Sequence, residues 1–277
     1  MIYFVPTPIG NLKDISLHAL DVLRGCESII CEDTRLSKSL INLLNDRFDA
    51  GINIQNFYSL HTHNEQDFFE NLDIKIFDKD VAFVSDAGMP GISDPGISLV
   101  RYAQQNDIKY EVLSGSSASL LALVASGLVD KEFIFLGFLP NTGKERAQAI
   151  QNALNLAYPA IIYESPKRIL ALVESIEKLD ENREIFLIKE ATKKFETKFR
   201  ASAKKMVEIL SCANLNGEWC VVVDKSKNVS TETIGINDIK DLDVAPKIKA
   251  KLLAKISGES AKKIYENLIS QKSQNYT

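Results

Sequence analysis

The sequence lacks three features that would place it in a membrane or outside the cell. Its longest unbroken apolar run is Leu120 to Ala125, well short of the roughly 18 residues that cross a bilayer. Its opening residues carry no positive region of the kind that begins a secretory signal. The four cysteines include no CxxC pair, and three of them lie in or beside apolar stretches, which is typical of reduced, buried thiols. We therefore expect a soluble cytoplasmic protein with no membrane partner.

Recognisable metal and nucleotide motifs are also absent. The chain has three histidines, and two of them, His61 and His63, are spaced so that their side chains turn to opposite faces of a strand. With no HExxH helix and no cysteine pair nearby, we predict no metal site. The turn at Pro6 to Asn11 has neither GxGxxG spacing nor the lysine of a P-loop. A metal-dependent or nucleotide hydrolase is therefore disfavoured.

An excess of positive charge is missing too, since the formal net charge is −4, and this sum alone argues against a polyanionic partner. The charge is unevenly distributed, however. Residues 189–205 and residues 244–277 each carry +5, which leaves −14 on the rest of the chain. Two basic segments on an acidic body are compatible with RNA binding. The candidate RNA contacts are Lys193, Lys194, Lys262 and Lys263. The alternative is that these lysines only solvate the surface.

What the first half of the sequence does contain is an alternation of short apolar runs with amphipathic segments. The strand-like runs lie at 2–6, 28–31, 54–60, 81–85 and 109–113, and the helical patterns at 15–23, 37–45, 64–72 and 97–105. This alternation predicts an α/β layer with mostly parallel strands.

The second half contains adjacent strand-like runs with no helix between them, which favours a mixed sheet. Helical patterns cover 144–156, 166–179 and 202–211, with Pro166 suited to the first turn of its helix, and strand-like runs cover 160–163, 184–189, 195–200 and 218–224. After a polar linker at 225–235, the pattern predicts two short helices broken at Gly258. The length fits two domains better than one. We predict α/β domains at 1–128 and 129–228 and a lysine-rich helical tail at 236–277.

Five consecutive strand-like runs of the first half end in clusters of glycine, proline or charged residues. The clusters are Pro6 to Asn11, Glu32 to Arg35, His61 to Glu65, Ser85 to Gly96, and Ser114 to Ala118. Ligands of α/β sheets bind beyond the carboxyl ends of the strands, so these clusters are candidates for a binding site. The fourth has three glycines and two prolines, which let backbone groups approach a ligand while limiting the entropy lost on ordering.

Some residues of these clusters have a structural interpretation, and others are better placed to bind a ligand. In the second, Asp33 or Thr34 would cap the following helix while Glu32 pairs with Arg35. In the fourth, Asp86 at the strand end is placed to accept hydrogen bonds from a ligand, whereas Asp94 before a proline suits an Asx turn. The fifth opens a helix whose free N–H groups can take an anion.

Taken in order, these segments resemble the tetrapyrrole methylase superfamily of S-adenosylmethionine-dependent enzymes, and most nearly its bacterial branch that methylates a ribose 2′-hydroxyl of small-subunit ribosomal RNA. The resemblance runs through VPTPIGNLKDISLHAL, CEDTR, HNE, VSDAGMPGISDPG, SASLLAL, FLGFLP, YESPKRI, KEATKKFE and GEWCVVV. It implies two α/β domains of the class III methyltransferase type, a small helical C-terminal domain, and a homodimer. It also implies S-adenosylmethionine as cofactor, S-adenosylhomocysteine as product, and a cytidine in the decoding region of 16S rRNA, or of the small subunit, as target.

The resemblance also implies roles for particular residues. The cofactor pocket would be lined by Ile9, Asp86, Met89, Ser117, Ala118, Tyr163 and Glu218. The catalytic candidates follow from the chemistry of the reaction, since a ribose hydroxyl must be aligned with the methyl group and lose its proton. The base or the ribose-orienting group would be one of Glu32, Asp33, His63 and Glu65, and Arg35, Lys193 and Lys194 would hold phosphates or stabilise a developing oxyanion. The chain departs from the family pattern where PGPSA is replaced by SGSSA and RELTK by KEATK.

Two other functions remain open. A corrin or porphyrin C-methyltransferase would share the fold but leave the lysine-rich tail without a use. A non-enzymatic rRNA-binding assembly factor would use both basic segments but not the glycine- and proline-rich strand ends.

Overall fold

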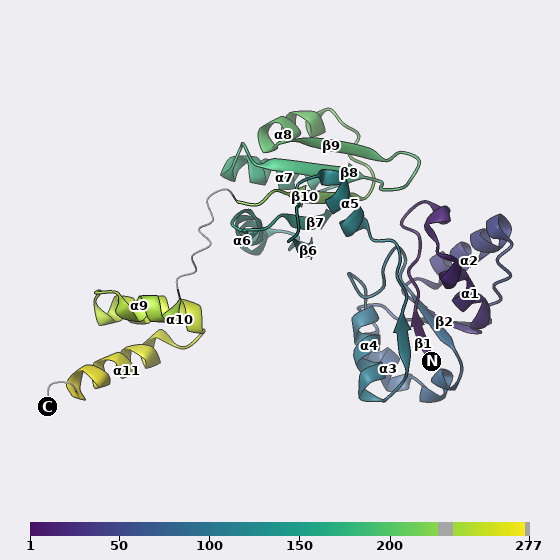
Figure 1. The fold of residues 1–277 in the computed structure, drawn as a ribbon, viewed down its shortest axis with the longest axis horizontal. Coiled ribbons are helices and arrows are strands. Elements are labelled where there is room, and N and C mark those ends of the chain that lie inside the picture. The colour runs from purple at the N-terminus through teal and green to yellow at the C-terminus, as the bar shows by residue number, and fades with distance from the viewer. Residues whose placement is uncertain (227–234, 275–277) are drawn as a thin grey trace. The chain divides into compact units, whose positions relative to one another are not determined.

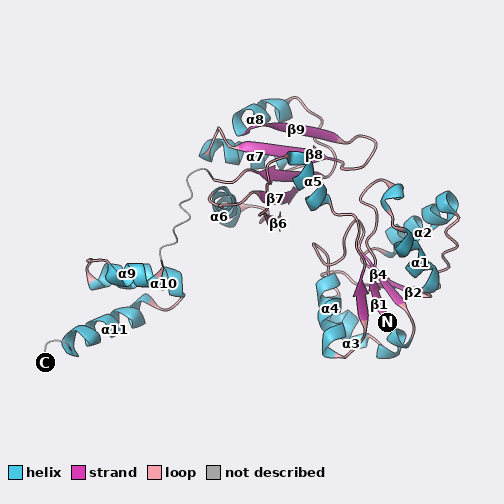
Figure 2. Cartoon of the chain, viewed as in Figure 1, coloured by secondary structure: helices cyan, strands magenta, loops and turns pink. Residues whose placement is uncertain are grey.

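The computed structural model describes residues 1–226 and 235–274, with side chains described to residue 270. Residues Met1–Ser226 form one compact unit, and the tail belongs to a second one, Lys227–Thr277. Most of the predicted linker at 225–235 lies outside the described residues. Figure 1 traces the chain and Figure 2 shows its helices and strands.

The first sheet is parallel throughout and follows the strand order β3-β2-β4-β1-β5. Its strands are β1 (Ile2–Phe4), β2 (Ser28–Cys31), β3 (Asn56–Ser59), β4 (Val81–Val84) and β5 (Tyr110–Val112). The helices between them are α1 (Leu17–Gly25), α2 (Thr34–Phe48), α3 (Glu65–Asn71) and α4 (Gly96–Gln105), with short 3-10 turns at Leu12–Asp14 and Ile74–Asp78. The five predicted strands and the parallel arrangement are confirmed. We call residues 1–115 the first lobe.

Alternation along the strands divides the first lobe's core between the two faces of the sheet. In β4, Ala82 and Val84 pack with α1 and α2, whereas Val81 and Phe83 pack with α4. Both faces are therefore covered by helices, and all four residues of β4 are buried. Such a sheet exposes only its strand ends and edges, which places the loops at the carboxyl ends where a ligand can reach them.

The second sheet is mixed, as predicted, with the order β6-β7-β10-β8-β9. Its strands are β6 (Ile134–Phe138), β7 (Ala160–Glu164), β8 (Glu184–Lys189), β9 (Thr197–Ser202) and β10 (Trp219–Val223). Only β6 and β7 run parallel; the other neighbours are antiparallel. Three helices, α6 (Gly143–Leu154), α7 (Ile169–Leu179) and α8 (Ala203–Ser211), contribute to the core cluster on one face. We call residues 118–226 the second lobe.

The other face of the second sheet is covered by α5 (Ala118–Ser126). Ala122 and Leu123 of this helix are buried against Ile161, Phe186 and Val222 of the sheet. The helix that follows β5 in the chain thus packs on the second sheet and not on the first. The predicted domain boundary between residues 128 and 129 stays a prediction.

Two local predictions were wrong. Helix α7 begins at Ile169 and not at Pro166, because residues 165–168 form a turn in which the Arg168 N–H donates to the Ser165 carbonyl at 3.0 Å. The tail contains three described helices and not two: α9 (Ile236–Asp241), α10 (Pro246–Ser257) and α11 (Ala261–Gln274). The break at Gly258 is confirmed, since this residue has φ of 72° and its N–H bonds to the Ala254 carbonyl. Helix α9 is too short to give a periodic signal.

The cysteines carry no disulfide within the described residues, and Cys26, Cys31 and Cys220 are buried while Cys212 is exposed. Three buried thiols were predicted, and burial raises the pKa of Cys220 to about 12. Across residues 1–226 and 235–274, none of the helices has the length and apolar character that crossing a membrane requires.

Candidate active site

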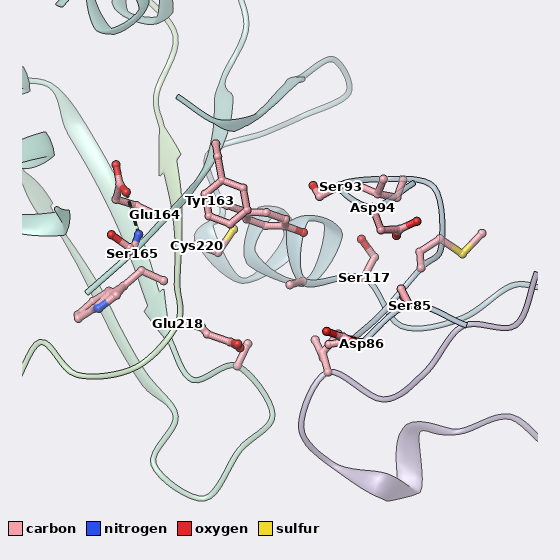
Figure 3. A pocket seen from close by; sticks show the side chains of 18 of the residues that line it. Ser85, Asp86, Ser93, Asp94, Ser117, Tyr163, Glu164, Ser165, Glu218 and Cys220 are labelled. Atoms are coloured by element: carbon pink, nitrogen blue, oxygen red, sulfur yellow. Dashed lines mark hydrogen bonds between the residues drawn. The ribbon is translucent and has the colours of Figure 1, made fainter. Parts of the chain in front are cut away.

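A cavity of about 410 Å³ lies where the strand ends of the first lobe meet the second lobe. All seven residues predicted for the cofactor pocket line it: Ile9, Asp86, Met89, Ser117, Ala118, Tyr163 and Glu218. Figure 3 shows Ser85, Asp86, Asp94 and Ser117 on one side and Tyr163, Glu164 and Glu218 on the other. The volume falls within the range of small-molecule sites. The cofactor role of these residues remains a prediction.

The first lobe's part of the cavity is held by the loop after β4, which is tied to the loop after β1. Thr7 and Gly88 exchange two backbone hydrogen bonds of 3.0 Å. The buried Thr7 hydroxyl donates to the Ser85 carbonyl at 3.2 Å and accepts from the Gly88 N–H at 3.1 Å. Gly88 has φ of 86°, and a Cβ there would lie 3.0 Å from the Ile9 side chain. Only glycine fits this position without strain.

Asp94 shapes the far end of the same loop. Its Oδ1 accepts hydrogen bonds of 2.8 Å from the N–H groups of Gly91 and Gly96. The predicted turn-forming role of Asp94 is confirmed, and the residue also lines the cavity. The prolines and these hydrogen bonds fix the loop before any ligand arrives, which lowers the entropy lost on binding.

The cavity lining is acidic. Five carboxylates line it, and no lysine, arginine or histidine does so within residues 1–226. Burial raises the pKa of Glu32, and the charges of Asp86, Asp94 and Asp33 raise it further. Burial also raises the pKa of Asp86, whose Oδ1 accepts a hydrogen bond of 3.1 Å from the Asp33 N–H. A cluster of carboxylates in low dielectric suits a cationic ligand that carries hydroxyl or amino donors.

Of the five predicted catalytic residues, only Glu32 lines the cavity. Asp33 is the N-cap of α2, and its Oδ1 accepts from the Arg35 N–H at 2.8 Å. The predicted pairing of Glu32 with Arg35 is wrong: the Arg35 guanidinium pairs with Asp33, 2.8 Å from its Oδ2. The hydrogen bonds from Arg35 lower the pKa of Asp33 to about 2, so Asp33 is a weak base.

The other two candidates, His63 and Glu65, lie at the start of α3 and do not line the cavity. The turn before α3 is organised by Asn64, whose side chain accepts from the His61 N–H at 2.8 Å and donates to the Ser59 carbonyl at 2.9 Å. No group of histidine, cysteine or carboxylate side chains among the described residues is arranged to hold a metal ion.

The second lobe's part of the cavity is largely apolar. The Tyr163 ring lies 5.0 Å from Phe135 and 5.6 Å from Phe138 between ring centroids. The Tyr163 hydroxyl accepts a hydrogen bond of 3.1 Å from the Ser119 N–H in the first turn of α5. Phe138, Ile188 and Trp219 also line the cavity. Sequence analysis did not single these three out, although Phe138 and Trp219 lie in the FLGFLP and GEWCVVV segments.

Lys193 lies close to the cavity, but its charge is already paired. Its Nζ donates to Glu218 Oε2 at 2.8 Å and to Glu190 Oε1 at 3.1 Å. A Cβ at Gly10 would lie 2.5 Å from Lys193 Cγ, so the stem of the lysine packs against the loop after β1. The Asn11 N–H donates to the Thr192 hydroxyl at 3.0 Å across the same contact. Lys193 therefore joins the two lobes, and its ammonium is not free.

Most of the basic segment at 189–205 is neutralised by acids from elsewhere in the second lobe. Arg200 pairs with Glu184 at 3.0 Å, Lys204 with Glu181 at 2.9 Å, and Lys205 with Glu208 at 2.5 Å. Of the predicted RNA contacts, Lys194 is exposed, with its Nζ 5.5 Å from the centre of the Phe195 ring.

In the tail, Lys262 and Lys263 are both exposed on α11. Lys263 lies 3.7 Å from Glu259, a contact that is weak at a solvated surface.

Comparison with known proteins assigns the chain and its fold to a family. Residues 1–207 match the family of Tetrapyrrole (Corrin/Porphyrin) Methylases. The uroporphyrin-III-C-methyltransferase of Thermus thermophilus aligns with a TM-score of 0.56 at 16% identity, covering 81% of this chain and 94% of that one. A cobalamin biosynthetic enzyme, cobalt precorrin-4 methyltransferase, aligns with a TM-score of 0.54 at 12% identity, covering 80% and 94%. At these identities the two structures share the fold alone.

Curated relatives are much more similar in sequence. The ribosomal RNA small subunit methyltransferase I of Campylobacter fetus is 64% identical over 97% of this chain and 100% of its own. The protein of the same name from Helicobacter pylori is 40% identical over 99% of this chain and 100% of its own, and that of Bacillus subtilis is 34% identical over 82% and 76%. The chain belongs to the tetrapyrrole methylase family, in the group of relatives named ribosomal RNA small subunit methyltransferase I.

Proposed function

We propose that this protein transfers the methyl group of S-adenosylmethionine to the ribose 2′-hydroxyl of a cytidine in the decoding region of 16S rRNA. The observation that carries this proposal is the acidic cavity lined by all seven residues that the family resemblance assigns to the cofactor. The names of the relatives support ribosomal RNA of the small subunit as the substrate class.

The residues of the cavity fit this cofactor. When bound, S-adenosylmethionine supplies an electrophilic methyl group on a positively charged sulfur. The carboxylates of Glu32, Asp86 and Asp94 favour a cation over an anion, as does the lack of basic side chains among the described residues that line the cavity. Asp86 would accept hydrogen bonds from hydroxyl or amino groups, and Tyr163 and Phe138 offer apolar rings for a heterocycle.

Glu32 is the group that we assign as general base. It lies at the end of β2 in the cavity, and its pKa is raised by burial and by neighbouring carboxylates, which moves it toward the operating pH and makes it a better proton acceptor. A ribose hydroxyl is a poor nucleophile, so Glu32 would accept its proton as the new bond to oxygen forms. Alignment of the ribose contributes more, since a correctly held reactant gains about 7–11 kcal/mol.

The test is mass-spectrometric mapping of rRNA methylation in a strain lacking this protein, complemented with wild type or with Glu32→Gln. We expect one cytidine ribose to lose its methyl group and only the wild type to restore it. An rRNA methylation pattern that is unchanged in the deletion strain would contradict the proposal.

The two alternatives give different results. An assembly factor would bind rRNA without binding S-adenosylmethionine or S-adenosylhomocysteine in calorimetry. A tetrapyrrole methyltransferase would keep its activity when the tail at 236–277 is deleted, whereas an enzyme that uses Lys262 and Lys263 to hold RNA would lose affinity for its substrate.

A further inference from the structure

A second set of basic side chains lies next to the cavity, partly in the YESPKRI segment, and none of these side chains was predicted to contact RNA. Two segments supply it: residues 141–146 after β6, and residues 165–168 after β7. Because β6 and β7 are parallel neighbours, their carboxyl ends bring the two segments together at one edge of the sheet. The Arg168 guanidinium hydrogen-bonds the Asn141 side chain and so joins them directly.

The centre of this basic cluster is one carboxylate shared by two arginines. Glu164, whose side chain is 1% exposed, has its Oε2 2.6 Å from Arg146 Nη2 and its Oε1 2.7 Å from Arg168 Nε. Burial alone would raise the pKa of Glu164, but the hydrogen bonds from Arg146 and Arg168 lower it. Glu164 is therefore ionised, and two guanidinium charges around one carboxylate leave an excess of +1.

Arg168 has N–H groups left with which to bind a further acceptor. Arg168 uses Nε for Glu164 and Nη1 for Asn141, and its side chain is 28% exposed. A guanidinium has five N–H donors, so those of Arg168 Nη2 remain for another acceptor. Arg146, 11% exposed, donates from Nη1 to the Pro140 carbonyl at 3.1 Å, which fixes its orientation.

Two lysines add to the cluster. Lys144 and Lys167 are exposed, and neither has an acidic partner within the part of the chain that the structure describes. Glu145 in the first segment and Glu164 just before the second are the acids here, so the cluster with its four basic side chains carries +2. Helices α6 and α7 also begin here, and the partial positive charge of their N-termini has the same sign.

The cluster lies beside the proposed reaction site. Glu164 and Ser165, which adjoin its basic side chains, line the cavity (Figure 3), and so does Pro166. A nucleotide whose ribose reached Glu32 would carry phosphate groups past the cavity's rim. The acidic lining would repel those phosphates, so a basic surface at the rim is needed to hold them.

We propose that Arg146, Arg168, Lys144 and Lys167 bind phosphate groups of the RNA next to the target nucleotide. This inference rests on the proposed function, since it names how the same site takes hold of its substrate. Arg168 offers the planar donors that suit a phosphate, and the two lysines act as point charges. The role differs from that of the predicted contact Lys193, whose ammonium is held by Glu190 and Glu218.

The test uses the full chain and a single-stranded small-subunit rRNA fragment that contains the decoding region. In the double variant Lys144→Ala/Lys167→Ala we expect RNA affinity to fall about tenfold near 0.1 M salt and the slope of log K against log salt to become shallower by about 1.4, the value for two phosphate contacts on a single strand. The affinity for S-adenosylmethionine, measured by calorimetry, should stay unchanged.

The matched control is Lys109→Ala/Lys178→Ala, which removes two exposed lysines without a described acidic partner, one before β5 and one at the far end of α7. Arg168→Gln should weaken RNA binding too, but it takes a partner from a buried carboxylate and lowers the thermal stability. The lysine variant therefore decides the question if Arg168→Gln does not fold.

Equal salt slopes for the wild type and Lys144→Ala/Lys167→Ala, or an equal loss in the control, would overturn the inference. Failure of the proposed function would look different. The wild type would then transfer no methyl group to the fragment, while its salt slope would still exceed that of the lysine variant.

Discussion

The two lobes line the cavity with different kinds of side chain. The first lobe offers carboxylates on loops fixed by backbone hydrogen bonds, with Thr7 tying Ser85 to Gly88. The second lobe offers rings and aliphatic side chains, and both of its carboxylates there are paired, Glu164 with two arginines and Glu218 with Lys193. The first lobe's side of the cavity thus carries carboxylates without a basic partner in the lining, and the second lobe's side is mainly apolar. The difference indicates that, inside the cavity, polar recognition and proton transfer belong to the first lobe, whereas the second lobe provides mainly apolar contact there and has its basic side chains at the rim.

The largest effect is expected at Glu32. Glu32→Gln keeps the size of the side chain but cannot accept a proton, so kcat should fall about 10²–10⁴-fold. The Kd for S-adenosylmethionine should stay within a few-fold of the wild type. Single-turnover methylation and calorimetry measure the two quantities, and Glu132→Gln, an exposed change outside the cavity, is the control. A fall in affinity with unchanged kcat would assign Glu32 to binding and not to chemistry.

Glu32 also predicts a pH dependence. Its pKa is raised in the folded protein, so the wild-type rate should fall as the pH drops through that raised value, and Glu32→Gln should lose this limb of the profile. The raised pKa also means that protonated Glu32 favours folding and that this stabilisation is lost as the pH rises through the folded-state pKa. At neutral pH, Glu32→Gln should therefore melt at a higher temperature than the wild type, with the gap closing in acid.

Asp86 should give the next largest effect. Asp86→Ala removes a charged acceptor, which is worth about 1.5–3 kcal/mol in a hydrogen bond, so the Kd for S-adenosylmethionine should rise about 10- to 150-fold. Asp46→Ala, a change on the exposed surface of α2, should leave the Kd unchanged. If Asp86→Ala is folded and retains its affinity, Asp86 lies outside the binding site.

Thr7 tests whether the first lobe's loops must be tied together. Thr7→Val keeps the shape of this buried residue but removes the hydroxyl that donates to the Ser85 carbonyl, at a cost of about 1–3 kcal/mol, while the Gly88 N–H keeps its hydrogen bond to the Thr7 carbonyl. We expect weaker cofactor binding by about 5- to 100-fold, with recovery in Thr7→Ser. Equal affinities of the valine and serine variants would show that the hydroxyl does not position the loop.

The smallest effect is expected at Tyr163 in the second lobe. Tyr163→Phe loses the acceptor for the Ser119 N–H but keeps the ring, so the Kd should rise only about 2- to 10-fold. Tyr158→Phe, on an exposed tyrosine of the same lobe, is the control. A loss as large as that of Asp86→Ala would mean that the second lobe recognises its ligand through polar contacts too.

Most strands of both sheets were predictable because their residues are buried on both faces and form short apolar runs. The strand order was not, since periodicity says nothing about which strands pair. Helix α9 was not predicted as a separate helix, because its six residues contain only two isoleucines and show no clear apolar periodicity. At Pro166, the preference of proline for a first helical turn predicted a helix start, but the Ser165 carbonyl accepts from the Arg168 N–H and forms a turn before the helix.

The seven cavity residues were predictable because they belong to an ordered series of motifs at strand ends. It was harder to predict which basic side chains are paired with acids. Counting residues 189–205 gave +5, yet the partners Glu181, Glu184, Glu208 and Glu218 lie outside that window. Ion pairs between distant segments depend on tertiary contacts, and a sum over a stretch of chain cannot include them.

The placement of α5 has a consequence for how the molecule can be divided. This helix follows the last strand of the first sheet, but Ala122 and Leu123 are buried against the second. A fragment cut after residue 128 would carry an apolar helix with no sheet to cover, and the remaining fragment would expose the face around Ile161 and Phe186 to water. The second sheet therefore needs residues on the N-terminal side of this cut to complete its interior, whereas the core clusters of the first sheet are formed by residues before α5.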